Sequence, residues 1–146
     1  MEALDCDVAI IGAGPAGVTL ANLLGQYGVS TMLIDRETQI LEEPRAVGID
    51  DEALRTLQGF GMAEEVLANA VRNAPIRYYD SHKRILAHVA PSGRPYGWPR
   101  RNLFFQPNLE AVLRKSLDRF GTVEMRTGCE AVGLVQDSEG VTVTAR

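Results

Sequence analysis

Residues 8–17 read VAIIGAGPAG, and residues 31–35 read TMLID. The first stretch is an apolar run that leads into three glycines spaced G-x-G-x-x-G, and the second is an apolar run that ends on an acid. This order predicts a strand, a glycine turn, a helix and a second strand, which is the pattern of a dinucleotide-binding βαβ unit. The sequence therefore predicts an α/β fold with a nucleotide site at its first turn.

The three glycines and the acid have separate tasks in such a unit. Gly12 allows the tight turn, Gly14 lets the backbone approach a pyrophosphate, and Gly17 lets the helix lie close to the strand. The helix, which begins at Pro15, offers N–H groups and a partial positive charge to phosphates. Asp35 lies where an acid would accept hydrogen bonds from a ribose diol. A turn that only closes a corner between strand and helix would need fewer glycines and no acid.

Composition excludes several other classes of protein. With 146 residues, of which 45% are hydrophobic and 23% charged, the chain has the size and composition of one globular domain. The net charge of −4 gives no reason to expect a nucleic acid as partner. No apolar run approaches the roughly 20 residues that span a bilayer, so no membrane segment is expected. Cys6 and Cys129 have no metal-ligand spacing, and we expect them to be reduced thiols of a cytoplasmic protein.

The spacing of apolar residues predicts the remaining elements. Strands are expected at residues 7–11, 30–35, 76–80, 84–89, 122–126, 131–136 and 141–145. Helices are expected at residues 15–27, from Asp50, at 62–70 and from Gln106. A βαβ start followed by antiparallel pairs favours an α/β fold with a second sheet over a plain doubly wound fold.

The last predicted strand ends at Arg146, the last residue of the chain. A domain seldom ends on a bare strand, because the unpaired edge is exposed. We therefore expect the chain to be a piece of a longer protein.

Four features resemble a known family. They are the glycine turn of residues 12–17, the pair Asp35-Arg36, the Pro-Arg-Ala sequence of residues 44–46 and the helix led by Gln106. Together they are similar to the N-terminal part of the class A flavoprotein aromatic hydroxylases. The resemblance covers nearly the whole chain, but only the first portion of those longer enzymes. It implies a Rossmann-like FAD-binding βαβ unit with antiparallel strand insertions, as the N-terminal fragment of a larger flavoprotein.

The resemblance also implies roles for individual residues. The pyrophosphate of FAD would be held by the turn and the first helix, that is by Gly12, Gly14, Pro15, Ala16 and Gly17. Asp35 would bind the adenosine ribose, beside Arg36, and Arg45 and Gln106 would contact FAD from a loop and from a later helix start. From spacing alone, Arg45 could equally be a solvated loop charge, and Gln106 is better explained as a helix cap. Arg36 could instead recognise a 2′-phosphate, although Asp35 would repel that group.

The activity that the resemblance implies is a FAD-dependent monooxygenase reaction. NADH or NADPH would supply electrons, and O₂ would hydroxylate a phenolic small molecule. A shorter stretch, residues 97–107, is similar to one branch of the family and points to that substrate class. No catalytic residue and no metal site is evident, and His82 and His88 are interpreted as surface or sheet residues. Residues 96–98 (Tyr-Gly-Trp) could shape a substrate pocket or pack at a sheet edge, and packing is favoured.

The chain would then divide into three segments. Residues 1–74 would form the FAD-binding βαβ portion, residues 75–101 a hairpin and loop toward a substrate domain, and residues 102–146 a return to the FAD-binding domain. Two alternatives stay open. One is an NAD(P)-dependent dehydrogenase, which would continue with regular βα repeats. The other is a noncatalytic nucleotide-binding fragment, inactive alone. The resemblance leaves open whether the whole protein forms an oligomer.

Overall fold

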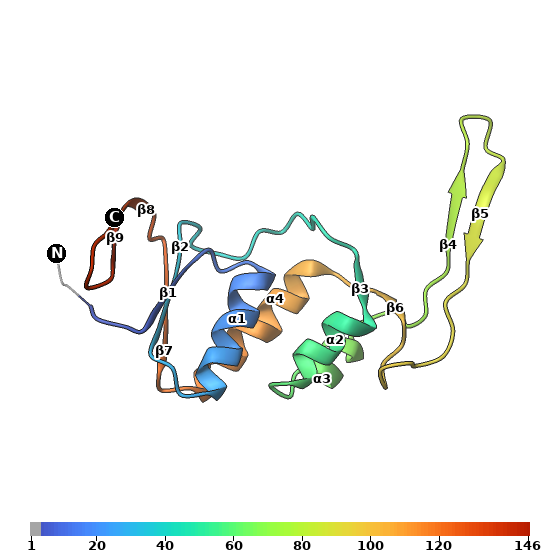
Figure 1. Cartoon of the computed structure of the whole chain (residues 1–146). Coiled ribbons are helices and arrows are strands. Elements are labelled where there is room, and N and C mark those ends of the chain that lie inside the picture. Colours follow the sequence, from blue (N-terminus) through green and yellow to red (C-terminus); the bar gives the residue numbers. More distant parts are fainter. Residues whose placement is uncertain (1–3) are drawn as a thin grey trace. The chain divides into compact units, whose positions relative to one another are not determined.

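The structure, a computed structural model, describes residues 4–146 and consists of two compact units (Figure 1). Unit 1 comprises the residues up to Glu43 and those from Glu110 on, and unit 2 comprises Pro44–Leu109. The predicted class, α/β with a βαβ start and antiparallel insertions, is confirmed. The division into residues 1–74, 75–101 and 102–146 stays a prediction.

Unit 1 is built on a three-stranded parallel sheet. Its strands are β1 (Val8–Ile11), β2 (Thr31–Asp35) and β7 (Val123–Thr127), in the order β1-β2-β7, and they run side by side in Figure 1. Helix α1 (Pro15–Gln26) connects β1 to β2. These four elements confirm the sequence prediction to within a residue or two. Because parallel strands end at the same edge of a sheet, the glycine turn after β1 and Asp35 at the end of β2 lie at one edge.

The core of unit 1 lies between α1 and one face of this sheet. Side chains alternate between the two faces of a strand, and Ile10 and Leu33, which pair in register, are both buried. Gly25 of α1 is in close contact with the aromatic ring of Phe120, since a Cβ there would come within 2.6 Å of that ring. The helix ends before Gly28, whose φ of +72° supplies the left-handed residue expected after a helix C-terminus.

A buried polar network joins α1 to α4 (Gln106–Lys115), which contributes its residues from Glu110 on to unit 1. The fully buried amide of Asn22 donates to the carbonyl oxygens of Val18 (2.9 Å) and Leu113 (3.0 Å) and accepts from the hydroxyl of Ser116. Ser116 begins the short 3₁₀ helix η1 (Ser116–Arg119). Because every polar atom of this amide has a partner, the network stabilises one arrangement of the two helices.

The other face of the sheet borders a cavity of about 640 Å³. Ala9, Met32 and Ile34 line it from the sheet, and residues 141–145 line it from a hairpin. That hairpin consists of β8 (Ala131–Gln136) and β9 (Val141–Ala145), and both strands have the predicted bounds.

Unit 2 contains two short helices, α2 (Asp51–Gln58) and α3 (Ala63–Ala68), both near their predicted positions. Asp50 caps α2 as expected, because its carboxylate accepts from the backbone N–H of Ala53 at 2.8 Å. Strands β3 (Gly48–Asp50) and β6 (Arg101–Leu103) form an antiparallel pair that the sequence analysis missed. Three residues are too few to show a strand period.

The buried side chain of Asn102 organises the backbone around this pair. Its amide nitrogen donates to the carbonyl oxygens of Ile49 (3.2 Å) and Pro99 (2.9 Å), and its oxygen accepts from Asn73 N–H (3.3 Å). Nearby in the chain, the indole of Trp98 donates to Gln58 at 2.9 Å. This contact joins Trp98 to α2 rather than to a sheet edge, and Tyr96 is exposed, so the choice between packing and a substrate pocket for residues 96–98 stays open.

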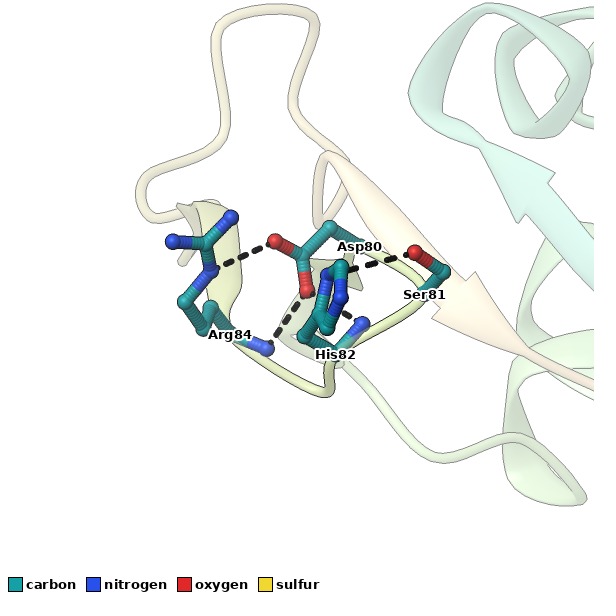
Figure 2. A network of polar contacts seen from close by, with 4 residues as sticks. All are labelled: Asp80, Ser81, His82 and Arg84. Carbon is teal, nitrogen blue, oxygen red and sulfur yellow. Dashed lines mark hydrogen bonds and ion pairs between the residues drawn. The ribbon is translucent and has the colours of Figure 1, made fainter.

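The second antiparallel pair of unit 2 is the predicted hairpin, β4 (Ile76–Tyr79) and β5 (Ile85–Val89). Its turn is organised by Asp80 (Figure 2). One oxygen of that carboxylate accepts from the backbone N–H groups of His82 (2.8 Å) and Arg84 (2.9 Å). The other oxygen accepts from Arg84 Nε at 2.7 Å. Both histidines of the chain, His82 and His88, are exposed on this hairpin, in agreement with their interpretation as surface or sheet residues.

No helix within residues 4–146 combines the length and the apolar character that crossing a bilayer requires.

The Asp80 turn has a testable pH dependence. Hydrogen bonds from the backbone and then the side chain of Arg84 favour the ionised carboxylate, so the pKa of Asp80 lies below its usual value. Because the pKa is lowered by folding, the contribution of Asp80 to the turn is present above the unfolded pKa and is lost as the pH falls through the folded pKa. We expect ¹³C NMR of the Asp80 carboxyl to show this low pKa. In Arg84→Gln, the pKa should rise only part of the way, because the backbone donors remain. A pKa of Asp80 at or above the usual value would contradict the assignment.

Candidate functional site

The glycine turn between β1 and α1 is the centre of the site. Gly12 has φ +107°, which L side chains rarely adopt, and its N–H donates to the carbonyl oxygen of Ile34 at 2.7 Å. Gly17 faces the carbonyl oxygen of Gly12 so closely that a Cβ at this position would collide with it. These two glycines therefore have the structural tasks that the sequence predicted for them.

Gly14 differs from both. Its φ of −74° suits any residue, and a Cβ built on it would meet no atom within 4 Å. Neither backbone conformation nor packing within unit 1 therefore requires glycine at position 14. Open space at this position, directly before the helix, is what close approach of a ligand to the backbone needs.

The N-terminus of α1 adjoins that open space. Gly14 is its N-cap residue, no side chain caps it, and its first turn contains no acidic residue. Pro15 occupies the first helical turn, where a missing N–H costs nothing, and Ala16 after it is exposed. No acidic side chain of the helix itself offsets the positive end of its dipole, which favours an anion there.

Asp35 reaches back from the end of β2 to the turn. One carboxylate oxygen accepts from the N–H of Ala13 at 2.6 Å, and the other accepts from the N–H of Glu37 at 2.8 Å. A carboxylate offers about four acceptor positions, so two bonds leave room for a pair of ribose hydroxyls. The sequence predicted the ribose contact but not the bond to Ala13, which ties the acid to the turn.

Arg36 points to a different partner. Its Nε lies 3.2 Å from the carboxylate of Glu37, and its side chain is 73% exposed. An exposed pair of this kind contributes little to stability, at most about 1 kcal/mol. Its proposed role at the cofactor stays a prediction.

Two predicted site residues meet within unit 2. The side-chain oxygen of Gln106 accepts from the backbone N–H groups of Arg45 and Ala46, both at 2.8 Å. Gln106 is buried, whereas Arg45 is exposed. From the sequence, helix capping was the better explanation of Gln106 by itself, but the structure shows its oxygen holding the loop that carries Arg45.

One residue at the turn escaped the sequence analysis. Arg114 of α4 donates from Nη2 to the carbonyl oxygen of Ala13 at 2.9 Å, with Glu110 3.6 Å away. Both are charged, lie four residues apart on one helix and are largely buried. A charged pair at this spacing on the apolar side of a helix was the signal that could have pointed to them.

Within residues 4–146, no three His, Cys, Asp or Glu side chains lie close enough together to hold a metal ion. Both cysteines, Cys6 and Cys129, are free thiols.

Comparison with known proteins agrees with this geometry. The family described as "FAD binding domain" matches residues 5–146. The 3-(3-hydroxy-phenyl)propionate/3-hydroxycinnamic acid hydroxylase of Burkholderia cenocepacia (strain HI2424) is 50% identical over 139 residues, 95% of this chain and 26% of that protein. The hydroxylase of the same name from Mycobacterium avium (strain 104) is 45% identical over 139 residues, 95% of this chain and 24% of that protein.

Solved structures give the same fold. The flavin-dependent monooxygenase PieE, crystallised with FAD and substrate, matches 99% of this chain and 27% of its own, with a TM-score of 0.83 and 25% identity. This chain therefore spans about a quarter of the length of the relatives that it matches. With the family match extending from residue 5 to residue 146, the chain belongs to the FAD binding domain family.

Proposed function

We propose that this chain forms the first FAD-binding part of a monooxygenase that hydroxylates a phenolic acid such as 3-(3-hydroxyphenyl)propionate. NADH or NADPH would be the electron donor and O₂ the second substrate. The names of the relatives, at 50% and 45% identity, support this substrate class. The chain alone would be inactive, because it spans only about a quarter of those enzymes.

The observation that carries the proposal is the open space at Gly14 beside the uncapped N-terminus of α1. It leaves room next to the backbone for a pyrophosphate, and the helix N-terminus favours the negative charge of that group. The N–H groups of the first helical turn, with Pro15, Ala16 and Gly17, would surround that anion. Asp35 would accept from the two ribose hydroxyls with the acceptor positions that Ala13 and Glu37 leave open.

Two further contacts were predicted, from Arg45 and Arg36, and the geometry of Arg45 suits its contact. Gln106 accepts two hydrogen bonds from the loop of Arg45, which fix the backbone of that loop. Arg45 itself is exposed, so its side chain can contact a ligand. A planar guanidinium suits a phosphate or a ring face. Arg36 would contribute a second positive charge near the ribose.

When bound, FAD supplies the redox chemistry that reduction by a nicotinamide and activation of O₂ require. The residues of this chain bind and orient it. The glycine turn and α1 would stabilise the charge of the pyrophosphate, and Asp35 would hold the adenosine end, so the rest of the cofactor would extend in one direction.

Absorbance and turnover of the complete protein test this proposal. We expect visible flavin bands, and NAD(P)H oxidation that rises with 3-(3-hydroxyphenyl)propionate and yields a hydroxylated product. 3-Phenylpropionate, which lacks the phenolic hydroxyl, is the matched control and should give no product. Protein that carries no flavin and takes up none when FAD is added would refute the proposal.

Gly14→Val should abolish FAD binding while the fold is retained. Its φ and surroundings accept a side chain, but the isopropyl group would fill the space proposed for the pyrophosphate. FAD titration measures the loss of binding, and the thermal midpoint of the apoprotein shows whether the fold is retained. Gly17→Ala is the contrasting variant, since its methyl group must displace the carbonyl of Gly12 and should lower the thermal midpoint. Normal FAD affinity in Gly14→Val would show that the pyrophosphate does not bind at this position.

Asp35→Ala should weaken FAD binding by about 1.5–3 kcal/mol, the range for hydrogen bonds to a charged group. The loss would combine the ribose contact with the bond that fixes Ala13 N–H. Asp35→Asn keeps an acceptor oxygen and should lose less. Isothermal titration with FAD measures both variants, and an unchanged affinity in Asp35→Ala would show that the ribose is held elsewhere.

A further inference from the structure

Arg114 lies largely buried beside the glycine turn, at 12% side-chain exposure. Its Nη2 donates to the carbonyl oxygen of Ala13 at 2.9 Å, and the nearby carboxylate of Glu110, 7% exposed, lies 3.6 Å from the same nitrogen. Ala13 itself is fully buried. The guanidinium thus acts on the backbone of the turn and not on its side chains.

Two opposite charges hold the backbone of Ala13. The carboxylate of Asp35 accepts from its N–H at 2.6 Å, and the guanidinium of Arg114 donates to its carbonyl. In a planar trans peptide the carbonyl and the next N–H point in opposite directions. The bond to Arg114 therefore directs the N–H of Gly14 away from α4.

The same bond strengthens that N–H as a donor. A carbonyl that accepts from a cation is polarised, and in a chain of hydrogen bonds the polarisation passes to the N–H of the same peptide group. The effect is largest where little water screens the charge.

Stability alone gives a weak reason for this arrangement. A buried ion pair often contributes no more than well-packed apolar side chains would, because both charges lose their hydration. Among the described residues, the buried Nε of Arg114 also has no hydrogen-bond partner. The Arg114–Glu110 pair is therefore better explained by the hydrogen bond that Arg114 donates to the carbonyl oxygen of Ala13.

We propose that Arg114 is a positioning residue for the dinucleotide: it orients and polarises the Ala13–Gly14 peptide so that the Gly14 N–H donates to the pyrophosphate. This inference rests on the proposed function. It adds to the βαβ unit a residue of α4, 101 positions away from Ala13 in the chain.

The test compares ligands that share adenine and ribose but differ in the diphosphate. In the complete protein, Arg114→Met keeps the length of the side chain without its charge and donors. We expect FAD and ADP to bind about tenfold more weakly, as for the loss of one charged hydrogen bond. Adenosine, measured as a competitor of FAD, should bind as before. Lys115→Met, an exposed cation one position along the same helix, is the matched control and should change none of the three affinities.

A second variant separates positioning from folding. Arg114→Lys keeps a charged donor and should restore part of the FAD and ADP affinity, even where Arg114→Met lowers the yield of folded protein. Unchanged ADP affinity in both variants, or an equal loss for ADP and adenosine, would overturn the inference while leaving FAD binding by the wild type intact. A wild type that binds no FAD would instead overturn the proposed function, and the inference with it.

Discussion

The close approach of α1 to the end of β1 is the constraint on which unit 1 depends. Gly17 lies against the carbonyl of Gly12 with no space for a side chain, so the helix begins directly at the strand end. This contact directs the N-terminus of α1 to the sheet edge where β2 ends in Asp35. Backbone N–H groups, an acid and the open space at Gly14 thereby come together in one small region. The proposed anion site depends on that arrangement and needs no cationic side chain in the turn itself.

The turn is nevertheless not held by the βαβ unit alone. Asp35, 22 residues away, accepts from the N–H of Ala13, and Arg114, 101 residues away, donates to its carbonyl oxygen. The buried amide of Asn22 in α1 hydrogen-bonds to Leu113 of α4 and to Ser116, and so connects α1 to α4. If the turn binds a dinucleotide as proposed, a change in the packing of α4 against α1 is expected to alter that binding.

In unit 2, too, buried polar side chains form hydrogen bonds with distant backbone groups, here in segments without regular secondary structure. Gln106 satisfies two N–H groups of the loop at Arg45, and Asn102 connects Ile49, Pro99 and Asn73. A buried polar side chain is costly unless its atoms are paired, so each of these amides fixes the backbone that pairs with it. Loops of this kind keep a defined shape without regular secondary structure.

The sequence by itself determined the βαβ unit, the two hairpins, the helix starts at Asp50 and Gln106, and the separate tasks of Gly12 and Gly17. These features have local signals: apolar periods of two or 3.6 residues, glycine where φ is positive, and an acid at a strand end. Only the tertiary structure decided the β3–β6 pair, the partners of Gln106 and the contact of Arg114 with the turn. Each of these contacts joins residues about 50 to 100 positions apart in the chain. The strand pair is only three residues long and the other two contacts involve one side chain each, so none of them produces a periodic pattern in the sequence.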